Sequence, residues 1–307
     1  MYRLNYEKRD MGLSFALAVG VMIVASLALG LIFGVEASGF TYWLMQALYT
    51  VIIGSAAFIY AAVTKTKVFV ATKMNRAPKY AHVLWGCLAT AFLVFCMTPL
   101  NRWLMDAIEA IGLKRPDVNL EKNVVGLLIV ACLLPCFTEE IVFRGTVAQS
   151  LEGNKNKLAS LAISGALFAL FHANPAQTVH QFVLGALLTL LVYRSGSLWT
   201  SVIVHFFNNA FVVGLSYTYV GSDEFWNVQH NMGWVLALFF VGIVGFALSV
   251  FGYLKTTKSV WQQDLRNGET EQTDVAKNVQ RNASSTVLLC VAVAVCVALW
   301  VTNLFMK

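Results

Sequence analysis

The chain has 307 residues, of which 58% are hydrophobic and only 12% are charged. Soluble domains usually carry about 25% charged residues, so this composition excludes a water-soluble globular protein and indicates an integral membrane protein. The formal net charge of +6 is typical of the Lys and Arg excess in cytoplasmic loops, and we expect no nucleic-acid partner. The six cysteines lie in apolar runs without paired spacing, and we interpret them as packing residues.

Nine apolar runs predict an all-α fold, a polytopic membrane bundle of eight or nine transmembrane helices. The runs are Met11–Gly34, Tyr42–Val63, Ala81–Leu100, Val124–Ser150, Leu158–His172, Val179–Tyr193, Leu198–Leu215, Gly233–Leu254 and Thr286–Met306. The fifth and sixth runs are shorter than the ~20 residues that a spanning helix usually needs. Such short spans favour a cavity within the bundle.

The charges of the loops predict how the chain is oriented in the membrane. If the N-terminus lies inside, the inner loops contain most of the basic residues, including those of Lys65–Lys79. The outer loop Ser216–Met232 contains Asp223 and Glu224 and neither Lys nor Arg. Because Lys and Arg are enriched in cytoplasmic loops, the sequence predicts an inside N-terminus.

The order of the runs divides the chain into three parts. Residues 1–123 contain the first three spans and, over residues 101–123, an amphipathic segment that we expect along the membrane interface. Residues 124–215 contain the fourth to seventh spans. Residues 216–307 contain the last two spans, which a polar linker over residues 255–285 joins, so that the ninth span is expected to be an appendage.

Two adjacent carboxylates, Glu139 and Glu140, stand near the middle of the fourth span. A charged side chain at the centre of a spanning helix costs roughly 3 kcal/mol even on lenient scales, so such a pair needs partners. Glu140 and Arg144 are four residues apart and share one helix face. The spacing therefore predicts a Glu140–Arg144 ion pair, and it leaves Glu139, about 100° round the helix, facing something else.

Three polar side chains on other spans are the expected partners of Glu139. His172 ends the fifth span, and His205 and Asn209 share one face of the seventh. At 1.5 Å per residue, these residues and Glu139 fall at depths of roughly 12 to 21 Å from the inner end of their helices. The four side chains are thus predicted to lie in one layer, whereas we interpret Asn208 as an interhelical hydrogen-bond donor.

An acid, two imidazoles and an amide in one layer are suited to hydrolysis. A Glu and a His that converge on one water can deprotonate it. A His and an Asn can donate hydrogen bonds to a developing oxyanion. The sequence has no HExxH motif, although zinc bound by Glu139, His172 and His205 stays an alternative.

The polar residues also form ordered motifs on separate predicted spans. The motifs are EExxxR at Glu139 to Arg144, FxxxH at Phe168 to His172, and HxxxN at His205 to Asn209. A further motif, Phe-x-x-Gly-x-x-x-Gly, is imperfect because Thr189 replaces its second glycine, which puts close helix packing there in doubt. The set resembles the CAAX protease and bacteriocin-processing family, the type II CAAX prenyl endopeptidase group of intramembrane glutamic proteases.

The resemblance implies an endopeptidase that cleaves a membrane-associated peptide or protein, with residues 124–215 as its catalytic core. It implies Glu139 as the general base, His172 as its assistant, His205 and Asn209 as the oxyanion hole, and Glu140 with Arg144 as the supporting pair. It also implies that no cofactor is needed and that the protein lies in the cytoplasmic membrane of a bacterium. Two other classes remain open, namely a non-catalytic scaffold or bacteriocin self-immunity protein, and a proton-coupled transporter.

Overall fold

The computed structural model describes residues 2–34, 37–110, 112, 123–154, 156–218, 225, 228–257 and 283–305, without the side chains of 228–230 and 283. Parts of three predicted segments lie outside these ranges, namely residues 111 and 113–122 of the interfacial segment, residues 219–224, 226 and 227 of the outer loop, and residues 258–282 of the linker. The inside N-terminus therefore stays a prediction.

The described chain is helical, and eight of its helices are long and apolar enough to cross a membrane. A ninth apolar helix is shorter, as expected for the fifth span. The prediction of an all-α bundle with eight or nine spans is confirmed. The helices are α1 (Lys8–Phe33), α2 (Gly39–Val63), α3 (Val68–Ala71), α4 (Tyr80–Ala110), α5 (Val124–Leu127), η1 (Leu128–Leu133), α6 (Leu134–Val142), η2 (Phe143–Val147), α7 (Ala148–Ser150), α8 (Lys157–Phe171), η3 (Pro175–Gln177), α9 (Thr178–Ser195), α10 (Leu198–Ser216), α11 (Val228–Thr256) and α14 (Ala283–Phe305).

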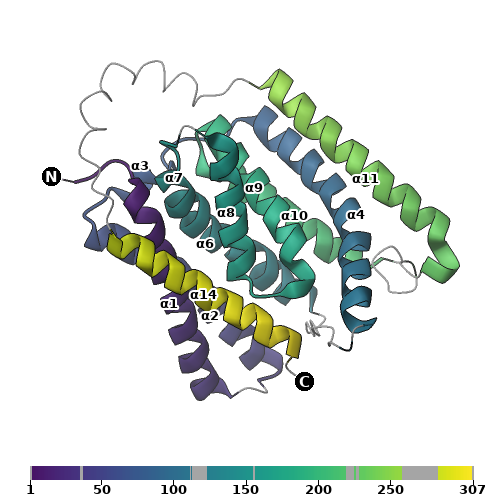
Figure 1. Cartoon of the computed structure of the whole chain (residues 1–307), viewed down its shortest axis with the longest axis horizontal. Coiled ribbons are helices and arrows are strands. Elements are labelled where there is room, and N and C mark those ends of the chain that lie inside the picture. The colour runs from purple at the N-terminus through teal and green to yellow at the C-terminus, as the bar shows by residue number, and fades with distance from the viewer. Residues whose placement is uncertain are drawn as a thin grey trace.

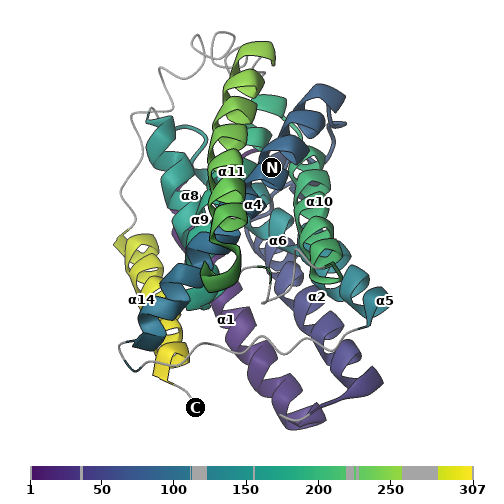
Figure 2. The same ribbon diagram turned by 90° about the vertical axis from the view of Figure 1, so that its right-hand side faces the viewer.

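The bundle has a central group of helices with a flank on either side. Helices α6, α8, α9 and α10 lie in the middle, α4 and α11 run side by side along one flank, and α1, α2 and α14 lie on the other (Figure 1). Figure 2 shows the pairing of α4 with α11 from the side. The segment that carries the paired carboxylates is therefore surrounded by other helices, which keeps its polar groups away from lipid.

Two differences from the expected fold concern the ends of helices and the last span. Helix α4 continues through Pro99 to Ala110, so the first residues of the predicted interfacial segment extend this helix. Helix α14 is not an appendage, because its Cys296 is fully buried in the same apolar cluster as Phe15 of α1 and Phe168 of α8. The last span therefore belongs to the main core of the bundle.

The fourth span is not a regular α-helix. Two π-helical stretches, η1 and η2, interrupt it on either side of α6, which carries Glu139 and Glu140. Pro135, in the first turn of α6, has no backbone N–H and cannot complete the hydrogen bonding of the preceding turn. Single π turns often occur at functional sites, and here they flank the two carboxylates.

Candidate active site

A buried ion pair joins Glu140 and Arg144. The Nη1 of Arg144 lies 2.6 Å from the Oε1 of Glu140, and both side chains are 0% exposed. The Nη2 of Arg144 donates to the carbonyl of Gly185 on α9 at 3.3 Å, and the guanidinium lies 4.1 Å from the ring centroid of Phe168. The contact predicted from the spacing of the two residues is present, and it ties α6 to α8 and α9.

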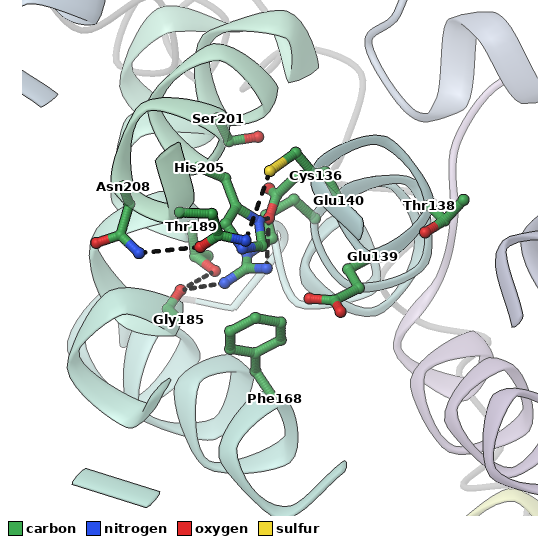
Figure 3. Close-up of polar contacts among 12 residues, drawn as sticks. Cys136, Thr138, Glu139, Glu140, Phe168, Gly185, Thr189, Ser201, His205 and Asn208 are labelled. Carbon is green, nitrogen blue, oxygen red and sulfur yellow. Dashed lines mark hydrogen bonds and ion pairs between the residues drawn. The ribbon is translucent and has the colours of Figure 1, made fainter. Parts of the chain in front are cut away.

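His205 joins this ion pair rather than Glu139. Its Nδ1 lies 2.9 Å from the Oε1 of Glu140, and because a carboxylate only accepts, the imidazole donates. Figure 3 shows Glu140 beside His205, while Glu139 lies apart from these contacts. One oxygen of Glu140 therefore accepts from two helices, so the predicted supporting pair is part of a larger network that includes His205.

Glu139 and His172 form a second cluster that faces a cavity of about 160 Å³. The Nε2 of His172 lies 3.8 Å from the Oε2 of Glu139, and each side chain is 18% exposed. This distance is too long for a direct hydrogen bond, and the Oε2 of Glu139 has no hydrogen-bond partner among the described residues. The remaining residues that line the cavity are Tyr49, Thr50, Ile53, Thr138 and Phe171.

The backbone of α8 sets the proton position on His172. Its Nδ1 lies 2.8 Å from the carbonyl of Phe168, and a carbonyl only accepts, so Nδ1 carries the hydrogen. In the neutral imidazole, Nε2 then has a free lone pair, and this is the atom that faces Glu139. Two acceptor atoms therefore point to the same space, an arrangement that suits a water molecule donating to both.

Asn209 satisfies the backbone of the π-helical segment. Its Nδ2 donates to the carbonyl of Ala131 at 2.9 Å, and its other close contact is the sulfur of Cys136 at 3.8 Å. In a regular α-helix, the N–H of residue 135 would bond to Ala131, but Pro135 has none. Asn208 donates to the Oδ1 of Asn209 and is also hydrogen-bonded to the His180 side chain on α9, so it makes an interhelical bond as expected.

The structure thus divides the predicted site residues into two groups. Glu139 and His172 face the cavity, whereas His205 lies with Glu140 and Asn209 lies against η1. Within the described part of the chain, no three His, Cys, Asp or Glu side chains are grouped so that they could hold a metal ion. The alternative zinc set is consequently divided between the two groups.

Phe168 and Tyr49 also lie at the site, although the sequence predicts no role for either of them. The Phe168 ring lies between the two clusters, with centroid distances of 4.6 Å to His172 and 6.0 Å to His205. Tyr49 lines the cavity from α2, in a part of the chain that carries no motif. The first position of the FxxxH motif could have indicated Phe168, whereas no sequence signal marks Tyr49.

The imperfect glycine motif still gives close packing between α8 and α9. A Cβ on Gly185 would lie 2.9 Å from the Cα of Gly165, so the two backbones are nearly in contact. Thr189, which replaces the second glycine, is buried and its hydroxyl lies 2.9 Å from that of Ser164. The doubt about packing at Thr189 is resolved, since a hydroxyl pair occupies the space.

The fold and the positions of the polar residues together define an intramembrane protein whose helical bundle contains clustered carboxylate and histidine side chains. Residues 121–211 match the family described as type II CAAX prenyl endopeptidase Rce1-like. The matched range contains both clusters, and this similarity to the type II CAAX prenyl endopeptidase family agrees with the resemblance carried by the motifs. No curated protein matches the chain.

Proposed function

We propose that the protein is an intramembrane endopeptidase that hydrolyses a peptide bond of a membrane-associated peptide or protein. The observation that carries the proposal is the pair formed by the Oε2 of Glu139 and the Nε2 of His172, 3.8 Å apart at the wall of a cavity. General-base catalysis requires an acceptor within hydrogen-bond reach of the water that it activates. Both acceptors meet this requirement for one water in the cavity.

The first step follows from the proton positions at this pair. The Nδ1–H of His172 is engaged by the Phe168 carbonyl, so Nε2 accepts one hydrogen of the water and Glu139 accepts the other. Glu139 takes its proton as the water oxygen forms a bond to the carbonyl carbon of the substrate. The same proton then passes to the amine that leaves when the C–N bond breaks, which restores the carboxylate.

The charge on the tetrahedral intermediate needs donors, and we assign this role to His205 and Asn209. Glu140 accepts from the Nδ1 of His205, so the Nε2 of this ring donates to the oxyanion when the imidazole carries a second proton. One hydrogen of the Asn209 amide has only the weak acceptor Cys136 nearby. Because the Phe168 ring lies between His205 and His172, the scissile carbonyl must extend past the edge of this ring to reach His205.

We propose that the reaction needs no metal. The residues that could bind zinc are divided between two clusters, and the Glu139–His172 pair supplies the base without a Lewis acid. Purified protein in lipid nanodiscs should therefore keep its activity after exhaustive chelation. If chelation abolished cleavage and zinc restored it, Glu139, His172 and His205 would have to be reassigned as ligands.

The proposal is tested with a panel of fluorescence-quenched peptides, including a prenylated CAAX peptide and its unprenylated counterpart. Wild-type protein should cleave at least one of them, and Glu139→Gln should not. Glu109→Gln, at an exposed position on α4, is the matched control and should cleave at the wild-type rate. Cleavage by Glu139→Gln at the wild-type rate would overturn the protease reading in favour of a scaffold or a transporter.

A further inference from the structure

Helix α14 contacts the loop that follows His172. The Nδ2 of Asn303 donates to the carbonyl of Ala173 at 2.6 Å, and the Nε1 of Trp300 donates to the Oγ1 of Thr178 at 2.7 Å. Both donors lie outside residues 121–211, the range that matches the protease family. We propose that Asn303 and Trp300 are positioning residues that hold His172 against the cavity, an inference that rests on the proposed function.

Ala173 needs such a contact because its backbone is strained. Its φ of 47° lies in the left-handed region, which glycine adopts freely and a residue with a Cβ does not. This conformation ends α8 directly after His172, with the N–H of Ala173 bonded to the carbonyl of Leu170 at 3.0 Å. The bond from Asn303 engages the carbonyl of the same residue, and it stabilises the left-handed turn against relaxation of the alanine backbone.

Trp300 supports the other end of the same loop. The Thr178 hydroxyl that accepts from Trp300 donates in turn to the carbonyl of Asn174 at 2.9 Å. The Asn174 side chain caps η3 by accepting from the N–H of Ala176 at 3.0 Å. A chain of hydrogen bonds thus runs from α14 through Thr178 to the residue next to Ala173, so the whole loop is fixed to one helix.

The helix that carries these donors is itself anchored. Ala292, Cys296, Trp300 and Asn303 recur at spacings that place them on one face of α14. Ala292 and Cys296 are buried in the core cluster that contains Phe168. Towards the opposite end of α14, the hydroxyl of Ser285 donates to the backbone carbonyl of Arg9 at 2.5 Å. The support for the loop is therefore a packed element of the core.

The function of this support follows from the distance at the active site. The Nε2 of His172 and the Oε2 of Glu139 are 3.8 Å apart, and displacement of a catalytic group by about 1 Å can cost about 10²-fold in rate. Releasing the backbone carbonyl of Ala173 would loosen the turn after His172 and let the His172 ring move relative to Glu139. Loss of the Asn303 donor should consequently lower kcat more than it changes KM.

The test uses Asn303→Leu, which has a similar size but no donor, in the full chain in nanodiscs. Thr302→Val, at an exposed position on the same helix, is the matched control. With [15N]histidine labelling, the chain gives signals from five histidines, and His172→Gln assigns that of His172. Asn303→Leu should shift the His172 ring signal, and Thr302→Val should not. On a prenylated CAAX peptide, Asn303→Leu should lose about 10- to 100-fold in kcat with little change in KM.

Two further variants make the result decisive. Trp300→Phe keeps the ring but removes the donor, and it should shift the same signal if Asn303→Leu fails to fold. Ala173→Gly removes the backbone strain, so Asn303→Leu should cost only a few-fold in that background, because glycine adopts the left-handed region freely. An unchanged His172 signal in both donor variants would overturn the inference. A shifted signal in a protein that cleaves no peptide would preserve it and reject the proposed function.

Discussion

The Nδ1 of His205 lies 2.9 Å from the Oε1 of Glu140, the same oxygen that accepts from Arg144. Glu140 therefore joins a residue of the proposed oxyanion hole to a buried cation, while Glu139 is free to act on water. Two adjacent carboxylates with different partners have different tasks.

Removing Arg144 should destabilise the fold as well as abolish activity. Both members of the ion pair are 0% exposed, and removing one partner of a buried pair typically costs about 3–5 kcal/mol because the other charge is left unpaired. Arg144→Ala should therefore unfold at a lower temperature in detergent, whereas Lys79→Ala, at an exposed position, should not. Normal melting and full activity of Arg144→Ala would show that the pair is dispensable.

Glu139→Gln should remove activity without loss of stability. The amide keeps the shape of the carboxylate but cannot take a proton, and general-base catalysis contributes about 10²–10⁴-fold. Glu139→Asp should also be poor, because the shorter side chain withdraws the carboxylate from the water. The measurement is kcat on a cleaved peptide together with the melting temperature, and a drop in melting temperature equal to that of Arg144→Ala would contradict the assignment.

Asn209→Ala should show two separable effects. Loss of an oxyanion donor should lower kcat by about 10²–10³-fold, and loss of the bond to the Ala131 carbonyl should lower stability by about 1 kcal/mol. Pro135→Ala in the same chain restores a backbone N–H, which in the α-helical register bonds to that carbonyl. The double variant should regain stability but not kcat. If it regained kcat as well, Asn209 would be only a structural residue.

Gly185→Ala should disturb the contact between α8 and α9. An added Cβ would lie 2.9 Å from the Cα of Gly165, and backbone atoms cannot yield as a flexible side chain can. We expect a lower melting temperature and a lower rate, since α8 carries His172. Gly20→Ala is the control, because nothing lies within 4 Å of its added Cβ and alanine favours a helix by about 1 kcal/mol.

Much of the fold was predictable because each apolar run is long enough to identify a span by itself. The Glu140–Arg144 contact was predictable because residues four apart on a helix are neighbours. The contact of His205 with Glu140 was not predictable from the sequence. Which of two adjacent carboxylates faces a neighbouring helix follows from regular α-helical geometry, and the π turns on either side of α6 change that geometry. Pro135 carried a signal for this irregularity, because its missing N–H leaves a carbonyl to be satisfied.

The contacts of α14 could not be read from its sequence. Cys296 and Ala292 look like residues of any apolar span, and a polar linker before them suggested separation from the core. Their burial depends on which helices α14 packs against. These contacts join residues that are far apart in the sequence, so the sequence of α14 alone does not indicate them. Tyr49 escaped prediction for the same reason, because its place at the cavity depends on how α2 packs against α6.

The bond between Asn303 and Ala173 spans 130 positions of the chain. A ribosome working at about 5–20 residues per second needs roughly 6–26 s to add them after the loop has been made. Until then the loop beside His172 has entered the membrane without the helix that holds it. Until α14 has been made, the proposed active site therefore lacks the two side-chain contacts that support the loop after its histidine.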